Sequence, residues 1–458
     1  MDNRKKILII AGAAISLVII VVIGILLFRN KGTTQNNNEP GIVDCEKDPT
    51  NKACQTNVSS EEATMIVWGL FDDSGAFQEA IKEFNKQYPK IKVTYVKKQY
   101  ADYEQSLVDA IASNDESAPD IFIMKNDWLP KHKSKISPAP SSTYDAESFN
   151  TTFITAAYND LVSEGKVYAI PFYMDNLVLF YNKKMFNDNN IYDPPETWDE
   201  VLSVSKILTQ KVTGNPNEIL QSGIALGTTS NITRSSDILL AMMMQTNTPI
   251  ISQDKRNFTF NQFRKDESGQ PYYPGTNALD FYTSFANPET SAYSWNSNFG
   301  NNIISFAQGK TAMILGFNYF IPQIEKENPK LSYGIAKFPQ IKTTSDERAT
   351  IANYWAFSVS KNSKIKDIAW DFLKNTVSTP SLKAYLDATG RVSPLKSDQT
   401  GIFSEQNNIT KTFFKGNADD LDRILNEMID DVVRYNQTSQ SAIDTAARKA
   451  NDMLAKYQ

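Results

Sequence analysis

The chain has 458 residues, of which 41% are apolar and 22% are charged, and its formal net charge is −5. This length allows two domains, and the apolar content is that of a globular protein rather than a disordered one. The acidic balance disfavours nucleic acid as a partner, because a phosphate backbone selects basic surfaces. The single histidine, His132, lies between two lysines, and we expect it to serve neither catalysis nor a zinc site.

A long apolar stretch follows the basic residues 1–6, which we expect to be cytoplasmic. Residues 7–28 carry no charge, and about 22 residues at ~1.5 Å each span ~33 Å, enough to cross a bilayer. The stretch ends in GILLF, without the small-residue cleavage site of a signal peptide and without a cysteine for lipid attachment. We therefore expect an uncleaved transmembrane anchor, with a signal peptide as the alternative. Both interpretations place the rest of the chain outside the cytoplasm.

Residues 29–63 are rich in Asn, Thr, Ser and Glu and show no apolar period, which is typical of a flexible stalk. Cys45 and Cys54, the two cysteines of the chain, lie close together in this stalk. Their spacing in an exported segment suggests a small disulfide loop, and two free thiols remain the alternative.

The pattern beyond the stalk alternates between strands and helices. Residues 64–70 predict a buried strand, residues 71–73 a turn, and Ser74 the N-cap of a helix. Further strands are predicted over residues 91–96 and 118–124, with a helix between them, and this order indicates a parallel sheet. Ligands of such sheets bind beyond the carboxyl ends of the strands.

Aromatic and polar side chains follow two of these strands. They are Trp68, Asp72, Asp73, Asn126, Asp127 and Trp128. An indole face can stack on the apolar face of a sugar ring, while neighbouring Asp and Asn bind its hydroxyls. The other tryptophans at strand ends or in loops are Trp295 and Trp355, whereas Trp198 and Trp370 fall within helix patterns and are expected in the core.

The second half of the chain predicts a more helical domain over residues 201–310. Thr197 and Glu200 have the spacing of a capping box, so Trp198 is expected to pack at a helix start. Residues 310–317 predict a strand that returns toward the first domain.

The familiar catalytic and cofactor motifs are absent from the sequence. The Gly309-Lys310-Thr311 triplet lacks the glycine that a phosphate-binding loop has five positions earlier, where Ile304 stands. A pair of carboxylates of the glycoside hydrolase type stays open, because sequence alone gives no distance between acids. The acids available for such a pair are Asp72, Asp73, Asp127 and Asp175.

Seven segments occur in an order that resembles one family. They are TMIVWGLFDDSGAF, APDIFIMKNDW, GKVYAIPFYMDNLVLFYNKKMF, PPETWDEV, FAQGKTAMILGFNYF, ANYWAFSVSKNS and ATGRVSP. The chain from residue 64 onward is similar to the extracellular solute-binding proteins of ABC importers, in the maltose-binding-protein-like group (family 1). The family usually has a lipoprotein signal, and the missing cysteine is a departure from that pattern.

The resemblance implies an α/β fold of two lobes, the type II periplasmic-binding-protein fold, with ligand held between them. In the implied hinge, the chain crosses from one lobe to the other near residues 172–177, 313–317 and 377–380. Lobe 1 would comprise residues 64–174 and 315–378, and lobe 2 residues 175–314 and 379–458.

The resemblance also implies a set of ligand contacts. Besides the six residues at the strand ends, they are Asp175, Trp295, Asn296, Tyr319, Asn353, Tyr354, Trp355 and Arg391. Asp175 would lie at the hinge, and Trp295 and Asn296 would reach in from the variable loops of the second lobe.

The expected function is that of a membrane-anchored receptor that binds a sugar or oligosaccharide and delivers it to the permease subunits of an ABC transporter. We expect a monomer that is not an enzyme and needs no metal or cofactor. The alternatives are a surface carbohydrate-active enzyme and a sensor or adhesin that has lost its coupling to transport.

Overall fold

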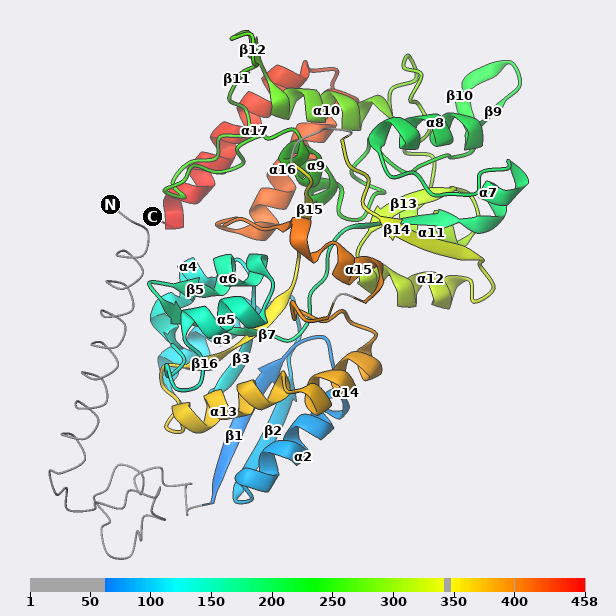
Figure 1. Ribbon diagram of the computed structural model, residues 1–458. Coiled ribbons are helices and arrows are strands. Elements are labelled where there is room, and N and C mark those ends of the chain that lie inside the picture. Colours follow the sequence, from blue (N-terminus) through cyan, green and yellow to red (C-terminus); the bar gives the residue numbers. More distant parts are fainter. Residues whose placement is uncertain (1–61, 342–346, 399, 458) are drawn as a thin grey trace, which may run out of the picture. The chain divides into compact units, whose positions relative to one another are not determined.

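The computed structural model describes residues 62–341, 347–398 and 400–457 (Figure 1). The predicted anchor over residues 7–28 and the predicted Cys45–Cys54 loop lie outside these residues. In the described part of the chain, every helix is too short or too polar to cross a membrane.

The first sheet contains the strands predicted after the stalk. Its members are β1 (Ala63–Gly69), β2 (Ile91–Lys97), β3 (Ile121–Lys125), β4 (Ile136–Ser137), β7 (Ile170–Pro171) and β16 (Trp355–Ser360). The order is β2-β1-β3-β16-β4, with β7 beside β16. The predicted parallel pairing is confirmed, since β1 runs parallel to both β2 and β3. The sheet as a whole is mixed, because β16 joins β3 in the antiparallel direction.

Helices and short strands complete the first half of the structure. They are α2 (Gln78–Gln87), α3 (Tyr103–Ser113), α4 (Leu129–His132), α5 (Ala146–Thr152), α6 (Thr155–Leu161), β5 (Val162–Ser163), β6 (Lys166–Val167), α13 (Lys366–Thr376) and α14 (Thr379–Thr389). The prediction that Ser74 caps a helix is wrong. Ser74 is the first residue of a 3-10 turn, η1 (Ser74–Phe77), and Asp73 occupies the N-cap position without a side-chain hydrogen bond.

The second sheet is antiparallel and has the order β13-β8-β14. Its strands are β8 (Val178–Asn182), β13 (Met313–Gly316) and β14 (Tyr333–Lys337). The helices and short strands around it are α7 (Lys183–Asp188), α8 (Trp198–Leu208), β9 (Gln210–Val212), β10 (Asn215–Gln221), α9 (Ser235–Gln245), β11 (Arg264–Lys265), β12 (Pro271–Tyr272), α10 (Pro274–Ser284), α11 (Asn302–Ala307), α12 (Ile321–Glu327), β15 (Thr350–Ile351), α15 (Gly401–Glu405), β17 (Thr410–Lys411), α16 (Ala418–Val433) and α17 (Ser439–Leu454).

The predicted capping box at the start of α8 is confirmed. The Thr197 hydroxyl accepts the Glu200 backbone N–H, and the Glu200 carboxylate accepts the Thr197 N–H. Trp198 is buried there, as predicted, and its indole N–H donates to Gln245.

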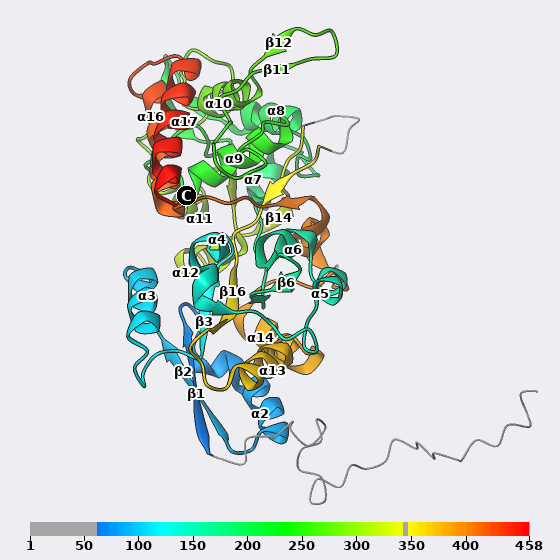
Figure 2. The same cartoon turned by 90° about the vertical axis from the view of Figure 1, so that its left-hand side faces the viewer.

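Two separate hydrophobic cores divide these elements into lobes. One core contains residues between Met65 and Met174 and between Ala352 and Tyr385. The other contains residues between Leu177 and Ile351 and between Leu421 and Leu454. The chain therefore crosses between cores at residues 174–177, at residues 351–352, and between Leu395, which packs on the first core, and Ile402, which packs on the second. Figure 2 shows α16 and α17 side by side in the second lobe.

Two of the predicted lobe boundaries are corrected by these cores. Residues 313–317 do not return to the first lobe, because β13 pairs with β8 and its side chains fill the second core. The boundary after residue 378 is also too early, because Leu382 and Tyr385 of α14 pack in the first core. The second and third crossings thus lie about 35 and 20 residues later than predicted. Contacts between strands and helices that are distant in the sequence determine where the chain crosses.

Candidate functional site

The ends of β3 and β16 bring six of the predicted residues together. Asn126, Asp127 and Trp128 follow β3, whereas Asn353, Tyr354 and Trp355 lead into β16. The two strands are antiparallel neighbours with Lys125 opposite Trp355, so the end of one lies against the start of the other. The rings of Trp128 and Trp355 meet edge to face, with centroids 5.3 Å apart.

Asp127 is the least satisfied polar group at this edge. Its side chain is buried, with the residue only 4% exposed, and neither carboxylate oxygen has a hydrogen-bond partner among the described residues. A buried carboxylate without a donor costs free energy, and folded proteins almost always supply one. The arrangement leaves two acceptors ready for the donors of a ligand.

Lys125 provides an unpaired charge of the opposite sign two residues earlier. It is 6% exposed, and its side-chain ammonium makes no hydrogen bond or ion pair within the described residues. Burial lowers the pKa of its ammonium group, while the charge of Asp127 acts in the other direction. A donor and an acceptor are thereby available side by side, which suits a neutral ligand with several hydroxyls.

An aromatic wall extends from Trp355. Phe71 lies 5.4 Å and Tyr100 lies 6.1 Å from its ring, measured between centroids. Both are large aromatic side chains that remain partly exposed. They follow the ends of β1 and β2, so the strand-end argument that selected Trp68 would also have found them. Both have a charged or amide neighbour, Asp72 or Gln99, yet sequence reasoning considered only tryptophans as stacking residues.

A charged cluster from the second lobe belongs to the same region. Arg234 precedes α9 with a left-handed backbone (φ 71°). Its guanidinium lies 3.3 Å from Asp237 and 3.5 Å from Asp422, and the Lys415 ammonium lies 3.0 Å from Asp237. Burial disfavours the charged form of Asp237, but Lys415 and Arg234 outweigh it and lower the pKa of its carboxyl to about 2. Burial lowers the pKa of Lys125, and the charges of Lys415, Arg234 and Asp422 also act on it, so the cluster lies within electrostatic range of the end of β3.

Asp160 of α6 forms hydrogen bonds with residues at the ends of β3 and β16. Its carboxylate accepts hydrogen bonds from Asn126 (3.0 Å), from the Tyr354 hydroxyl (2.8 Å) and from the Thr412 hydroxyl (2.8 Å). Burial raises the pKa of Asp160 to about 7, although these bonds favour the charged form. Asn126 and Tyr354 are themselves buried, and their side chains donate to Asp160 rather than to a ligand. They therefore hold the neighbouring Asp127 and Trp355 in position.

Asp72 and Arg391 are brought together, but they satisfy each other. The guanidinium donates two hydrogen bonds to Asp72, at 3.0 and 3.3 Å, and lies over the Tyr173 ring. The Tyr385 hydroxyl donates to the other oxygen of Asp72. Asp73 points away from this pair, with a side chain 84% exposed and an ion pair of 2.8 Å to Lys97.

Two other predicted residues have partners within the protein. Trp68 is buried, and the Lys98 ammonium lies 3.9 Å from its ring centroid. Asp175 lies at the first crossing, where it accepts the Asn318 backbone N–H at 2.8 Å. Burial raises the pKa of Asp175 to about 7, although the hydrogen bond from Asn318 acts in the opposite direction.

Tyr319 is partly exposed and stacks on Phe317, whose ring also lies beneath the guanidinium of Arg234. Asn353 donates its backbone N–H to the carbonyl of Asp175. Both residues therefore lie beside the first and second crossings, and their contact with ligand stays a prediction.

Trp295 does not fit its predicted role. It is 0% exposed, stacks on Phe299, and donates its indole N–H toward Thr228 and Asn231. It therefore fills the second core and has no free face for a ligand. Its neighbour Asn296 donates to the Tyr293 hydroxyl, and a ligand contact for Asn296 stays a prediction.

The four acids considered for a glycoside hydrolase differ in their partners. Asp72 and Asp73 pair with cations, Asp175 accepts a backbone N–H, and Asp127 alone of the four lacks a partner. Groups of three or more side chains suited to a metal ion do not occur in the described ranges. The arrangement is that of a binding site with one free carboxylate.

Comparison with known proteins shows the family of the chain. Residues 68–381 match the family described as bacterial extracellular solute-binding protein. A binding protein of Brucella abortus is 24% identical over 299 residues, covering 65% of this chain and 67% of the relative. The maltotriose-binding protein of Pyrococcus abyssi is 26% identical over 142 residues, which are 31% of this chain and 29% of that protein.

Solved structures share the fold. The cyclic α-maltosyl-1,6-maltose binding protein of Arthrobacter globiformis superposes with a TM-score of 0.70 at 19% identity, covering 86% of this chain and 99% of that one. The sugar-binding protein MalE of Xanthomonas citri gives a TM-score of 0.68 at 18% identity, over 86% and 98%. This chain belongs to the family of bacterial extracellular solute-binding proteins.

Proposed function

We propose that this chain captures a sugar or oligosaccharide between its lobes and delivers it to the permease subunits of an ABC importer. The observation that carries the proposal is the buried Asp127 carboxylate, which has no partner in the described structure and lies beside the rings of Trp128 and Trp355. Aromatic rings next to a carboxylate that accepts hydrogen bonds from hydroxyl groups are the groups that a carbohydrate needs. The maltotriose-binding relative supports the same class of ligand.

Ligand capture would stabilise the closed arrangement of the lobes. The first lobe offers Asp127 and Lys125, and the second offers Arg234 with its partner Asp422. A ligand that touches both walls binds the closed state better than the open one, and this difference in affinity drives closure. The permease then distinguishes the loaded receptor by its shape, and ATP hydrolysis belongs to the importer.

Residues 7–28 would hold the receptor at the outer face of the cell membrane. The support is their length of about 22 uncharged residues and the extracellular character of the family. Membrane fractionation followed by N-terminal peptide mass spectrometry tests this part. An intact residue 1–28 segment in the membrane fraction is expected, and a mature chain that begins after residue 28 would contradict it.

A thermal-shift panel tests the function. Purified protein is heated with maltose, maltotriose, diacetylchitobiose, mannobiose, a peptide mixture, spermidine and sulfate. A bound ligand at a hundredfold excess over its Kd stabilises the native state by about 2.7 kcal/mol. We expect the shift with at least one sugar and with none of the other three, whereas a shift confined to the peptides, the polyamine or the oxyanion would contradict the proposal.

A further inference from the structure

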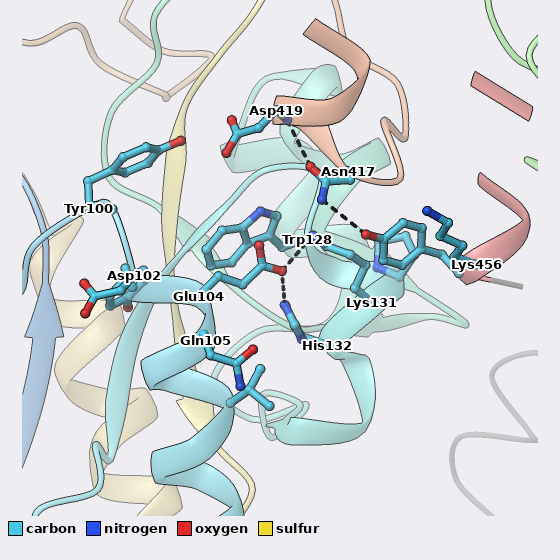
Figure 3. Close-up of a pocket in the computed structure, with 15 residues that line it drawn as sticks. Tyr100, Asp102, Glu104, Gln105, Trp128, Lys131, His132, Asn417, Asp419 and Lys456 are labelled. Atoms are coloured by element: carbon cyan, nitrogen blue, oxygen red, sulfur yellow. Dashed lines mark hydrogen bonds and ion pairs between the residues drawn. The ribbon is translucent and has the colours of Figure 1, made fainter. Parts of the chain in front are cut away.

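A pocket of about 700 Å³ adjoins the strand-end site, which is within the size range of small-molecule sites (Figure 3). Four segments line it: the loop before α3 with the start of that helix, the segment around α4, the start of α16, and the last residues of the chain. The first two segments belong to the first lobe and the last two to the second. The pocket is therefore formed by both lobes.

Two aromatic residues are shared between this pocket and the strand-end site. Trp128 lines the pocket and contacts Trp355 at 5.3 Å, and it directly follows Asp127 in the chain. Tyr100 also lines the pocket and lies 6.1 Å from Trp355. Burial raises the pKa of the Tyr100 hydroxyl, and the charges of Asp419 and Asp127 raise it further. The pocket thus continues the strand-end site rather than forming a separate cavity.

The far part of the pocket repeats the chemistry of the strand-end site. Tyr457 offers a partly exposed ring, and Asp419 and Lys456 offer a carboxylate and an ammonium group. In Figure 3, Trp128 lies between Tyr100 on one side and Lys456 on the other, with Asp419 near Tyr100. The wall also contains an unsatisfied polar atom, the buried Nδ1 of His132.

Hydrogen bonds and ion pairs fix both walls of the pocket. The Glu104 carboxylate lies 2.7 Å from the Lys131 ammonium and 2.8 Å from the His132 ring, joining α3 to α4. On the other wall, Asn417 donates to the Tyr457 hydroxyl at 3.2 Å. The Lys131 ammonium lies 5.6 Å from the Tyr457 ring and so connects the two walls. Walls held in this way bind a ligand without much loss of side-chain entropy.

We propose that this pocket is an outer subsite for the additional units of an oligosaccharide whose first unit lies at Asp127. The inference rests on the proposed function and deepens it. Asp127 does not line the pocket that contains Tyr457, so a single sugar ring at Asp127 leaves the second set of rings and charges to the further units of a longer ligand. The receptor therefore selects oligosaccharides over mono- and disaccharides, and Tyr457 at the chain end is a residue that determines this selectivity.

Isothermal titration of the full chain with maltose, maltotriose, maltotetraose and the corresponding chitin oligomers tests the outer subsite. Wild type is expected to bind a tetramer at least tenfold more tightly than the dimer of the same sugar. Tyr457→Ala should lower tetramer affinity roughly five- to tenfold, the effect of one lost aromatic contact, and leave dimer affinity unchanged. Tyr457→Phe keeps the ring and should retain tetramer affinity, whereas Tyr435→Ala, on an exposed tyrosine that does not line the pocket, is the matched control.

The results separate the two proposals. Equal affinity for dimer and tetramer, or an equal loss at every length in Tyr457→Ala, would overturn the outer subsite and leave the proposed function standing. Absence of binding by every sugar would contradict both.

Discussion

The Thr412 hydroxyl donates a hydrogen bond of 2.8 Å to Asp160, and this bond joins the two lobes directly behind the candidate site. Asp160 belongs to the first lobe, whereas Thr412 follows the third crossing. Because the same carboxylate also accepts from Asn126 and Tyr354, the position of the binding residues is linked to that of the hinge.

Asp160→Ala should weaken both stability and binding. The change leaves three donors without an acceptor, the buried Asn126 and Tyr354 and the half-buried Thr412, and each buried one costs about 1–3 kcal/mol unless water enters. The melting temperature should fall, and ligand affinity should fall with it because Asn126 and Tyr354 lose their support. Differential scanning calorimetry and titration measure the two effects, and Asp109→Ala on the exposed face of α3 is the control. An unchanged affinity in a folded variant would show that Asp160 has only a structural role.

Stability should decrease as the pH rises from about 4 to about 7. Burial raises the pKa of both Asp160 and Asp175 to about 7 in the folded chain, whereas unfolded aspartate titrates near pH 4. Between these values the folded state binds more protons than the unfolded state, so each group lowers the free energy of unfolding by up to about 1.4 kcal/mol per pH unit. Glu104 and Asp237, whose pKa values are lowered to about 2, add stability only below this window, as pH rises from about 2 to about 4.

Urea denaturation at pH 5 and pH 7.5 measures this slope. Asp175→Asn should flatten it, because the amide does not titrate. A free energy of unfolding that rises with pH across this window would contradict the assignment.

The Asp72–Arg391 pair should matter for stability more than for binding. Both side chains are largely buried and fully used by each other, by Tyr385 and by Tyr173. Removing one partner of such a pair costs about 3–5 kcal/mol when the remaining charge stays buried. Asp72→Asn should therefore lower the urea midpoint clearly, and Asp73→Asn, at the exposed neighbour, should leave it nearly unchanged. A loss of affinity in Asp72→Asn without a loss of stability would restore Asp72 to the binding site.

Trp295 and Trp355 should respond oppositely to substitution. Trp295→Phe should destabilise the second lobe, because the indole N–H bonds to Thr228 and Asn231 are lost from a fully buried site. Trp355→Phe should change affinity more than stability, because its ring joins the wall formed by Phe71 and Tyr100. Parallel melting and titration curves check both variants, and a reduced affinity in Trp295→Phe alone would reverse the assignment.

The sequence predicts local features of this fold well. The first three strands, the capping box at Thr197 and the burial of Trp198 all depend on neighbours within a few residues. The strand-end argument also places Asp127 at this edge of the sheet, and the resemblance adds Trp355, the first residue of the antiparallel neighbour β16.

The misplaced features depend on contacts between distant parts of the chain. Residues 313–317 pair with β8, more than a hundred residues earlier, and no local pattern distinguishes this partner from a strand of the first lobe. Trp295 resembles a ligand residue in sequence because Asn296 and Tyr293 surround it, yet its hydrogen-bond partners Thr228 and Asn231 are supplied by a distant loop. The cluster of Arg234, Asp237, Lys415 and Asp422 was missed for the same reason.

Titration of the Asp127→Asn variant tests the central claim most directly. The substitution keeps the size of the side chain and removes an unpaired buried charge, so the ligand-free protein should be as stable as wild type or more stable. For the sugar that gives the largest thermal shift with wild type, the variant should lose at least tenfold in affinity, because a hydrogen bond to a charged acceptor is worth about 1.5–3 kcal/mol. Wild-type affinity in a folded Asp127→Asn variant would contradict the claim that sugar binds at this carboxylate.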